Sequence, residues 1–152
     1  MTAVRPATVE DAGAIGELLY AFNREYDEET LPAAAIADRL RELLAGSETI
    51  ALLAGPGPDG FAVLRLRPAL ASPGLECYLA ELYVIPARRR QGLGLALMEE
   101  VIATARAAGA DHLSLDTSED DVGARALYER MGLVNREGGP DGPISYCYER
   151  TL

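Results

Sequence analysis

We predict an α/β domain in which a mixed β-sheet carries helices on both of its faces. Short β-type runs and amphipathic helical runs alternate along the chain, which is typical of this class. No linker long enough to divide the chain interrupts them, and no segment repeats. The 152 residues have the length of one domain and suffice for a core without disulfides or metal. We therefore expect residues 1–152 to form a single domain.

The first half of the chain predicts one strand, two helices and three strands, in that order. Residues 4–6 form a short strand, and Thr8 then caps a helix with apolar residues at helical spacing. The acidic run 25–29 reads as a loop that ends at Pro32. A second helix follows at 33–44, and β-type runs separated by Gly- and Pro-rich turns occupy 49–54, 61–67 and 76–84.

The second half predicts two helices and three further strands. The strongest helical pattern in the chain covers 92–108, with an apolar stripe on one side and charges on the other. A strand at 112–116 and a helix at 122–131 come next. Two final strands are expected at 133–136 and 144–150, on either side of a loop rich in glycine and proline.

Composition excludes several classes of function. The net charge of −10 and a pI near 4.5 argue against nucleic-acid partners, which need a basic face. All 14 basic residues are arginine, so a lysine nucleophile or P-loop lysine is impossible. No apolar run approaches the ~20 residues of a membrane span, and the N-terminus lacks the apolar core of a secretory signal. We expect a cytoplasmic protein without a membrane partner.

The cysteines and the single histidine do not predict a metal site. Cys77 and Cys147 each lie in a β-type run, where we expect two buried thiols that act as small apolar side chains. Together with His112 they lack the ligand spacing of a zinc site. We expect His112 to be an exposed or hydrogen-bonded residue without a catalytic role.

The segment 82–94 is the part of the sequence that indicates a binding site. A strand ends, three arginines follow at 88–90, and Gly92 and Gly94 open a helix. A helix N-terminus offers unpaired N–H groups and partial positive charge, and glycine lets an anion approach the backbone. The pattern predicts a cradle for an anion, most simply a diphosphate. The dinucleotide fingerprint and the P-loop are both absent.

The run Arg89-Arg90-Gln91-Gly92-Leu93-Gly94 resembles the [QR]-x-x-G-x-[GA] signature of the GNAT acetyltransferase superfamily. The V-x-P pattern that precedes it is met at 84–86, and residues 124–133 resemble the second family block, A-x-x-L-Y-x-x-x-G-[FL]. The resemblance implies a single GNAT domain with a mostly antiparallel sheet. It also implies acetyl-CoA-dependent transfer of an acetyl group to an amine.

The resemblance also implies roles for individual residues. The strand residues Leu82, Tyr83 and Val84 would contact the pantetheine arm of coenzyme A, with the Val84 N–H polarising the thioester carbonyl. The backbone amides of 89–94 would hold the diphosphate, and Tyr128 would protonate the departing thiolate. Asp121 stands where the family often has asparagine, and a carboxylate cannot donate the same hydrogen bond to the pantetheine arm.

The general base is less sharply defined. Glu81 precedes the motif on its strand, and strand alternation places it with Tyr83 on the face opposite Leu82 and Val84. It would accept the proton of the amine directly or through a water relay; the alternative is a strand-edge glutamate in a salt bridge. The acidic run 25–29 would attract a cationic acceptor, or is simply a solvated loop.

These observations predict an N-acetyltransferase that transfers acetyl directly to a small amine within a ternary complex. The alternative is a non-catalytic acyl-CoA-binding or sensing module with the same fold, and a plain nucleotide-binding protein is a third reading. The sequence does not identify the amine. By analogy with the family, a homodimer could form through the terminal strands, although the sequence does not decide the oligomeric state.

Overall fold

The computed structural model describes residues 3–152 of the chain. These divide into two compact units, the first ending at Leu115 and the second spanning Asp116–Leu152, and each is described by itself. Within the described range, no helix is long and apolar enough to cross a membrane.

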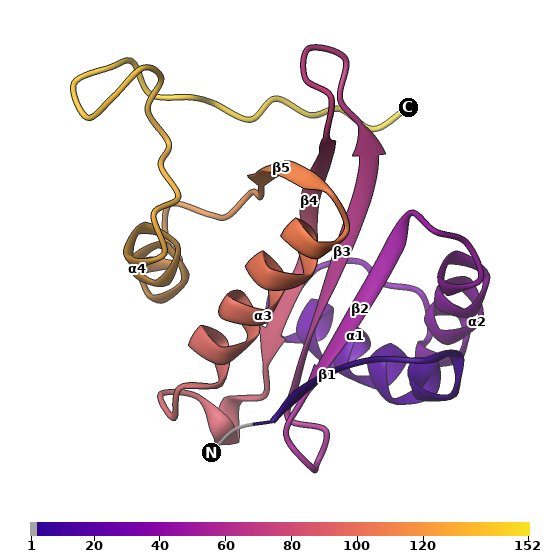
Figure 1. The fold of residues 1–152 in the computed structure, drawn as a ribbon. Helices are drawn as coiled ribbons and strands as arrows, with labels where there is room; N and C mark the ends of the chain where they lie inside the picture. Colours follow the sequence, from indigo (N-terminus) through magenta and orange to yellow (C-terminus); the bar gives the residue numbers. More distant parts are fainter. Residues whose placement is uncertain (1–2) are drawn as a thin grey trace. The chain divides into compact units, whose positions relative to one another are not determined.

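A five-stranded sheet forms the centre of the first unit (Figure 1). Neighbouring strands follow one another in chain order, the first three pairs being antiparallel and the last pair parallel. The prediction of a mixed, mostly antiparallel sheet is confirmed. The strands are β1 (Val4–Pro6), β2 (Thr49–Ala54), β3 (Gly60–Pro68), β4 (Leu75–Val84) and β5 (Ala110–Ser114).

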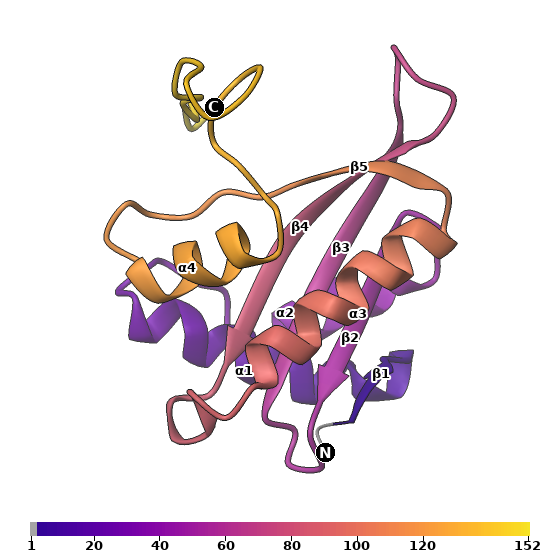
Figure 2. The same ribbon diagram turned by 60° about the vertical axis from the view of Figure 1, so that its left-hand side comes forward.

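Helices cover both faces of this sheet, as predicted. One face carries α1 (Ala12–Glu25) and α2 (Ala33–Leu44), and the other carries α3 (Leu93–Ala107), as Figures 1 and 2 show. A 3₁₀ turn, η1 (Val9–Asp11), leads into α1, and Thr8 is the residue that caps this turn. The core on the α1/α2 face is a cluster built on Ala12, Ile15, Leu18, Ala37, Leu40, Ala51, Leu53, Phe61, Val63 and Tyr83.

Strand β5 begins two residues earlier than predicted. It spans Ala110–Ser114, because Leu75 pairs with Ala110 and Cys77 pairs with Leu113 across the parallel ladder. His112 is exposed on this strand, as expected. Of the two cysteines, Cys77 is buried as predicted, whereas Cys147 is exposed, so the prediction of two buried thiols is wrong for Cys147.

The second unit contains α4 (Val122–Arg130) and an irregular C-terminal segment. The prediction of strands at 133–136 and 144–150 is wrong: within the described residues this segment has one isolated antiparallel bridge, between Arg136 and Ile144. Backbone bonds from Glu137 to Pro143 and from Ser145 to Asn135 continue the hairpin for one step on each side. An isolated two-stranded hairpin is only marginally stable in water, which agrees with a single bridge in this segment.

Candidate functional site

A β-bulge in β4 decides which side chains face each side of the sheet. Val63 lies opposite Glu81, while the next residue of β3, Leu64, lies opposite Leu79. Ala80 is therefore an extra residue without a partner, and the alternation of β4 changes face at this point. Without the bulge, Glu81 would share the face of Leu79, which is the α3 face.

After the bulge, β4 presents the two faces that the sequence predicted. Tyr83 lies opposite Phe61 and belongs with it to the core cluster on the α1/α2 face. Glu81, two residues earlier, shares this face, and Leu82 and Val84 point to the other one. The prediction that Glu81 and Tyr83 lie opposite Leu82 and Val84 is confirmed.

The edge of β4 that turns away from β3 is only partly paired. Strand β5 pairs with residues Leu75 to Tyr78, and among the described residues no strand continues this pairing along the rest of β4, up to Val84. Backbone groups at the end of β4 are thus open to a partner with the hydrogen-bonding pattern of a strand. The assignment of Leu82, Tyr83 and Val84 to the pantetheine arm stays a prediction, and for Tyr83 it is limited to the backbone because its side chain is buried.

The three consecutive arginines after β4 have different environments. Arg88, at the end of the 3₁₀ turn η2 (Pro86–Arg88), donates to the buried carboxylate of Asp59 at 3.0 Å and to Gln91 at 3.1 Å. Arg89 forms an ion pair with a second carboxylate, that of Glu25. Within residues 3–152, Arg90 forms no ion pair, and its backbone is left-handed at φ 61°. Among the described residues, Arg90 is therefore the one of these three arginines whose charge is not paired with a carboxylate.

Arg89 is the centre of a four-residue cluster. Its guanidinium forms a forked ion pair with Glu25 at 2.7 and 2.8 Å, and its Nε donates to the Val84 carbonyl at 3.0 Å. The same guanidinium lies 5.5 Å from the centre of the Tyr83 ring, and the Tyr83 hydroxyl donates to Glu25 at 2.9 Å. Burial, followed by this hydrogen bond, raises the pKa of Tyr83 to about 12, so the phenol is neutral. The hydrogen bonds from Arg89 lower the pKa of Glu25, which is ionised.

The start of α3 fits a phosphate. Gly92 precedes the helix in a left-handed conformation, φ 85°, and the first helical hydrogen bond runs from the Ala96 N–H to the Gly92 carbonyl. The N–H groups before Ala96 therefore face the free end of the helix. A Cβ added to Gly92 would meet no atom within 4 Å, so the space beside these amides is open. The residues present thus suit the diphosphate of coenzyme A, while the binding roles of Arg89, Arg90, Gln91, Gly92, Leu93 and Gly94 stay predictions.

Glu81 is the one carboxyl group in this unit whose pKa is shifted towards neutrality. Burial, and secondly the negative charge of Glu28, raise its pKa to about 7. Its cross-strand partner is the apolar Val63, which offers no counter-charge. A carboxylate in this state takes up protons near neutral pH, as a general base for an amine must.

The end of α1 holds Glu28 in a defined place. The Asp27 N–H bonds to the Arg24 carbonyl and the Glu28 N–H bonds to the Asn23 carbonyl, with Asp27 left-handed at φ 55°. These two bonds form a Schellman motif. The predicted loop at 25–29 is corrected in one respect: Glu25 is the last residue of α1, and its charge is paired with Arg89.

In the second unit, Asp121 caps α4: its Oδ1 accepts the Ala124 N–H at 3.1 Å. The carboxylate thus has a structural role that asparagine could also fill. Tyr128 is half-buried on the same helix. A contact of Asp121 with pantetheine and the acid role of Tyr128 stay predictions.

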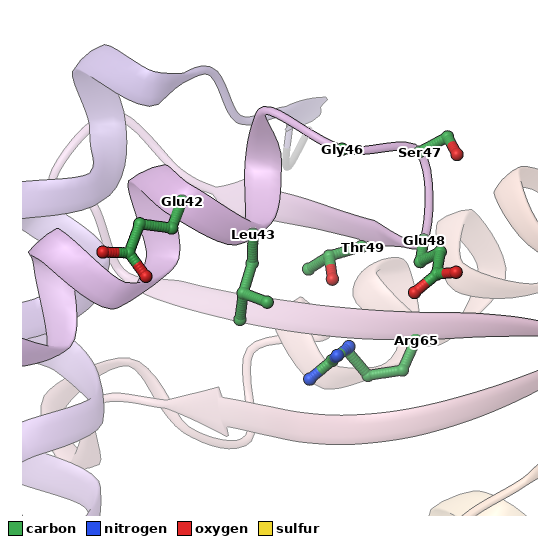
Figure 3. A pocket seen from close by; sticks show the side chains of 7 residues that line it. All are labelled: Glu42, Leu43, Gly46, Ser47, Glu48, Thr49 and Arg65. Atoms are coloured by element: carbon green, nitrogen blue, oxygen red, sulfur yellow. The ribbon is translucent and has the colours of Figure 1, made fainter.

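A separate pocket lies at the opposite end of β2 and β3 from the motif (Figure 3). In Figure 3 Thr49 and Arg65 come from paired positions on the two strands, beneath the end of α2. The pocket lacks a helix N-terminus, so it does not resemble the diphosphate cradle. Its lining residues are Glu42, Leu43, Gly46, Ser47, Glu48, Thr49 and Arg65.

Sequence reasoning missed Asp59 and assigned Glu25 to the acidic run 25–29 without its ion pair to Arg89. Asp59 and Glu25 lie 29 and 64 residues from their arginine partners, so spacing gave no sign of either ion pair. A weak signal existed for Asp59: its carboxyl group occupies the space that a Cβ on Gly55 or Gly57 would need. The glycines of this hairpin therefore make room for a buried acid.

The fold and the site define an α/β protein with an open strand edge and a helix N-terminus that is suited to an anion. The model of the acetyltransferase (GNAT) family matches residues 15–133. The chain belongs to the GNAT acetyltransferase family, whose members use acetyl-CoA as the acetyl donor.

Three individual proteins illustrate this relationship. A crystal structure from Arthrobacter sp. FB24, provisionally assigned as an acetyltransferase, is 38% identical with a TM-score of 0.88, over 98% of this chain and 96% of the other. The uncharacterized N-acetyltransferase YhfO of Bacillus subtilis (strain 168) is 28% identical over 146 residues, 95% of each protein. An aminoglycoside N(6')-acetyltransferase type 1 of Stenotrophomonas maltophilia is 30% identical over 141 residues, 88% of this chain and 87% of the relative.

Proposed function

We propose that this protein is an acetyl-CoA-dependent N-acetyltransferase that acetylates a primary amine of a small cationic acceptor. The observation that carries the proposal is Glu81, a half-buried carboxyl group with its pKa raised to about 7, three residues before the end of the strand that leads to the diphosphate cradle. A sensing module would need the cradle but no such base. The name of the Stenotrophomonas relative makes aminoglycosides the first acceptors to test.

The proposed reaction is direct transfer. The amine must lose a proton before it attacks the thioester carbonyl, and an alkylammonium group has a pKa of about 10.4. An ordinary glutamate, at about 4.3, is a poor acceptor for this proton; Glu81, with its pKa near 7, is a much closer match. The nitrogen–carbon bond forms, the carbon–sulfur bond breaks, and Tyr128 gives its proton to the thiolate sulfur. The nitrogen loses its second proton to solvent as the amide forms, and a proton from solvent restores the Tyr128 phenol.

One feature of the first unit supports a cationic acceptor. Glu28 raises the pKa of Glu81 through its charge, so the two carboxyl groups lie close enough to interact. Glu25 contributes no free charge because Arg89 neutralises it. A cation placed between Glu28 and Glu81 would relieve their repulsion.

The test is release of the coenzyme A thiol from acetyl-CoA in the presence of single amines. The panel comprises aminoglycosides, polyamines, amino acid amides and a peptide with a free N-terminus. Amine-dependent release that is lost in Glu81→Gln supports the proposal. Binding of acetyl-CoA without release for any amine would instead support the acyl-CoA-sensing alternative.

A further inference from the structure

We infer that Glu25 is a positioning residue for the transfer: through Arg89 it fixes the end of α1, and with it Glu28, relative to Glu81 and the diphosphate loop. This inference deepens the proposed function and rests on it for its meaning in the reaction. The juxtaposition itself is a property of the first unit alone.

The first link joins α1 to the end of β4. Arg89 uses both terminal nitrogens on Glu25 and its Nε on the carbonyl of Val84, so one guanidinium ties the two elements together. A forked, charge-assisted pair of this kind fixes orientation as well as distance. The hydroxyl of the buried Tyr83 donates to the same carboxylate at 2.9 Å, and the Tyr83 ring lies 5.5 Å from the Arg89 guanidinium.

The second link fixes the peptide between Val84 and Ile85 from both sides. Its carbonyl accepts the bond from Arg89, and its N–H, on Ile85, donates to the Asp59 carbonyl at 2.9 Å. Asp59 also holds Arg88. The backbone that connects the end of the strand to the diphosphate loop therefore depends on both ion pairs.

The third link runs from Glu25 to Glu28. Glu25 lies within the last turn of α1, and the Schellman bonds from Asp27 and Glu28 close directly around it. The side-chain bond from Asn23 to Thr30, at 3.0 Å, fastens the segment that follows. If Arg89 releases Glu25, the end of α1 loses its charged tie to β4 and keeps the stacking of Phe22 on Tyr83. We expect Glu28 then to shift away from Glu81.

This arrangement explains why an arginine in the diphosphate motif makes no side-chain contact suited to phosphate. The charge of Arg89 instead holds the end of α1, which carries Glu28, against the end of β4, which leads to the diphosphate loop. Loss of Glu25 is thus expected to affect both substrates, although Glu25 itself touches neither reacting atom.

The test measures the pKa of Glu81 without turnover. Side-chain carboxyl signals of ¹³C-labelled glutamate are titrated in the wild type, in Glu25→Gln and in the double variant Glu25→Gln/Arg89→Gln, with the Glu81 signal assigned by its loss in Glu81→Gln. The charge on Glu28 is the one nearby charge that raises this pKa, so both variants should lower it from about 7. The double variant removes one charge of each sign and thus separates movement of Glu28 from the direct effect of an unpaired Arg89.

Kinetics supply the second readout. In Glu25→Gln, kcat should fall about tenfold, well within the ~10² that a displacement of 1 Å can cost, and the double variant should be no worse, because the two residues act as a unit. The matched control is Glu76→Gln, which breaks the Arg67–Glu76 pair at 2.6 Å across the far ends of β3 and β4. This control should change neither the pKa of Glu81 nor kcat.

An unchanged pKa of Glu81 in both variants would overturn the inference, as would a lowered pKa in Glu25→Gln that returns to the wild-type value in the double variant. Melting curves test whether each variant is folded. If a variant does not fold, Glu25→Asp is measured in its place. A chain that acetylates no amine would contradict the proposed function, but the titration would still decide the role of Glu25.

Discussion

Glu81 lies opposite Val63 on the face of the sheet covered by α1 and α2, one residue after the unpaired Ala80 of the β4 bulge. The bulge turns a glutamate that would otherwise point toward α3 to the same side as Glu28. Burial and, secondly, the like charge of Glu28 raise its pKa, whereas an exposed glutamate would titrate near its ordinary value.

The first prediction concerns Glu81 as the base. Glu81→Gln should lower kcat by about 10² to 10⁴, the usual contribution of a positioned base. In the wild type, kcat/KM for the amine should fall as the pH drops below about 7, where Glu81 is protonated. A pH–rate profile of both proteins checks this. A water relay that bypasses Glu81 would leave the acidic limb in place in the variant.

The same substitution should stabilise the fold in a pH-dependent way. The pKa of Glu81 is raised in the folded protein, so its ionisation destabilises the native state increasingly from about pH 4.5 up to about 7. Glutamine removes this penalty. The melting temperature of Glu81→Gln should therefore exceed that of the wild type clearly at pH 8 and little at pH 4.5. An equal difference at both values would mean that the pKa is not raised.

The second prediction concerns Glu28 and the acceptor. Glu28→Gln should raise KM for a cationic amine about fivefold, the effect of roughly 1 kcal/mol from one partly exposed charge. It should also lower the pKa of Glu81, because a like charge is removed. Glu29→Gln removes the same charge one residue further along and is the matched control. If both variants raise KM equally, the acidic segment acts only through its overall charge, and salt should abolish the effect.

The third prediction concerns the diphosphate cradle. Gly92 has a positive φ, so a side chain there strains the backbone whether or not phosphate binds. Gly94, the second residue of α3, is the better site: Gly94→Val should weaken acetyl-CoA binding at least tenfold, because a branched side chain would crowd the amides. Calorimetry gives the affinity. Gly13→Val, at the same position of α1 and with no neighbouring atom within 4 Å, is the control for helix propensity.

The fourth prediction concerns Tyr128 as the acid. Tyr128→Phe should lower kcat at least tenfold while changing KM for acetyl-CoA much less. A thiol of pKa about 8.5 is a tolerable leaving group unaided, so the loss should lie in or somewhat below the 10² to 10⁴ range of positioned acids. Phenylalanine keeps the packing of the ring. A loss below threefold in a folded variant would assign Tyr128 to packing alone.

Local sequence was sufficient to predict most of the helices and strands and the family motif at 89–94. Apolar spacing predicts the helices at 33–44 and 92–108, because this spacing depends on residues within a few positions of one another. Gly92, predicted to lie inside the second of these helices, lies just before it in a left-handed conformation. The same reasoning failed at 133–136 and 144–150. A strand exists only when a partner pairs with it, and these runs find one bridge between them.

The sequence by itself determined the family signature, the order of the helices and the sheet in the first unit, and the absence of lysine chemistry. Only the tertiary structure decided which arginines are free. Arg88, Arg89 and Arg90 are chemically identical, but Asp59 and Glu25, distant in sequence, neutralise the first two. The bulge at Ala80, which sets the direction of Glu81, is likewise a property of the register between two strands. Charge partners and register are set by contacts between distant segments, and these contacts exist only once the chain has folded.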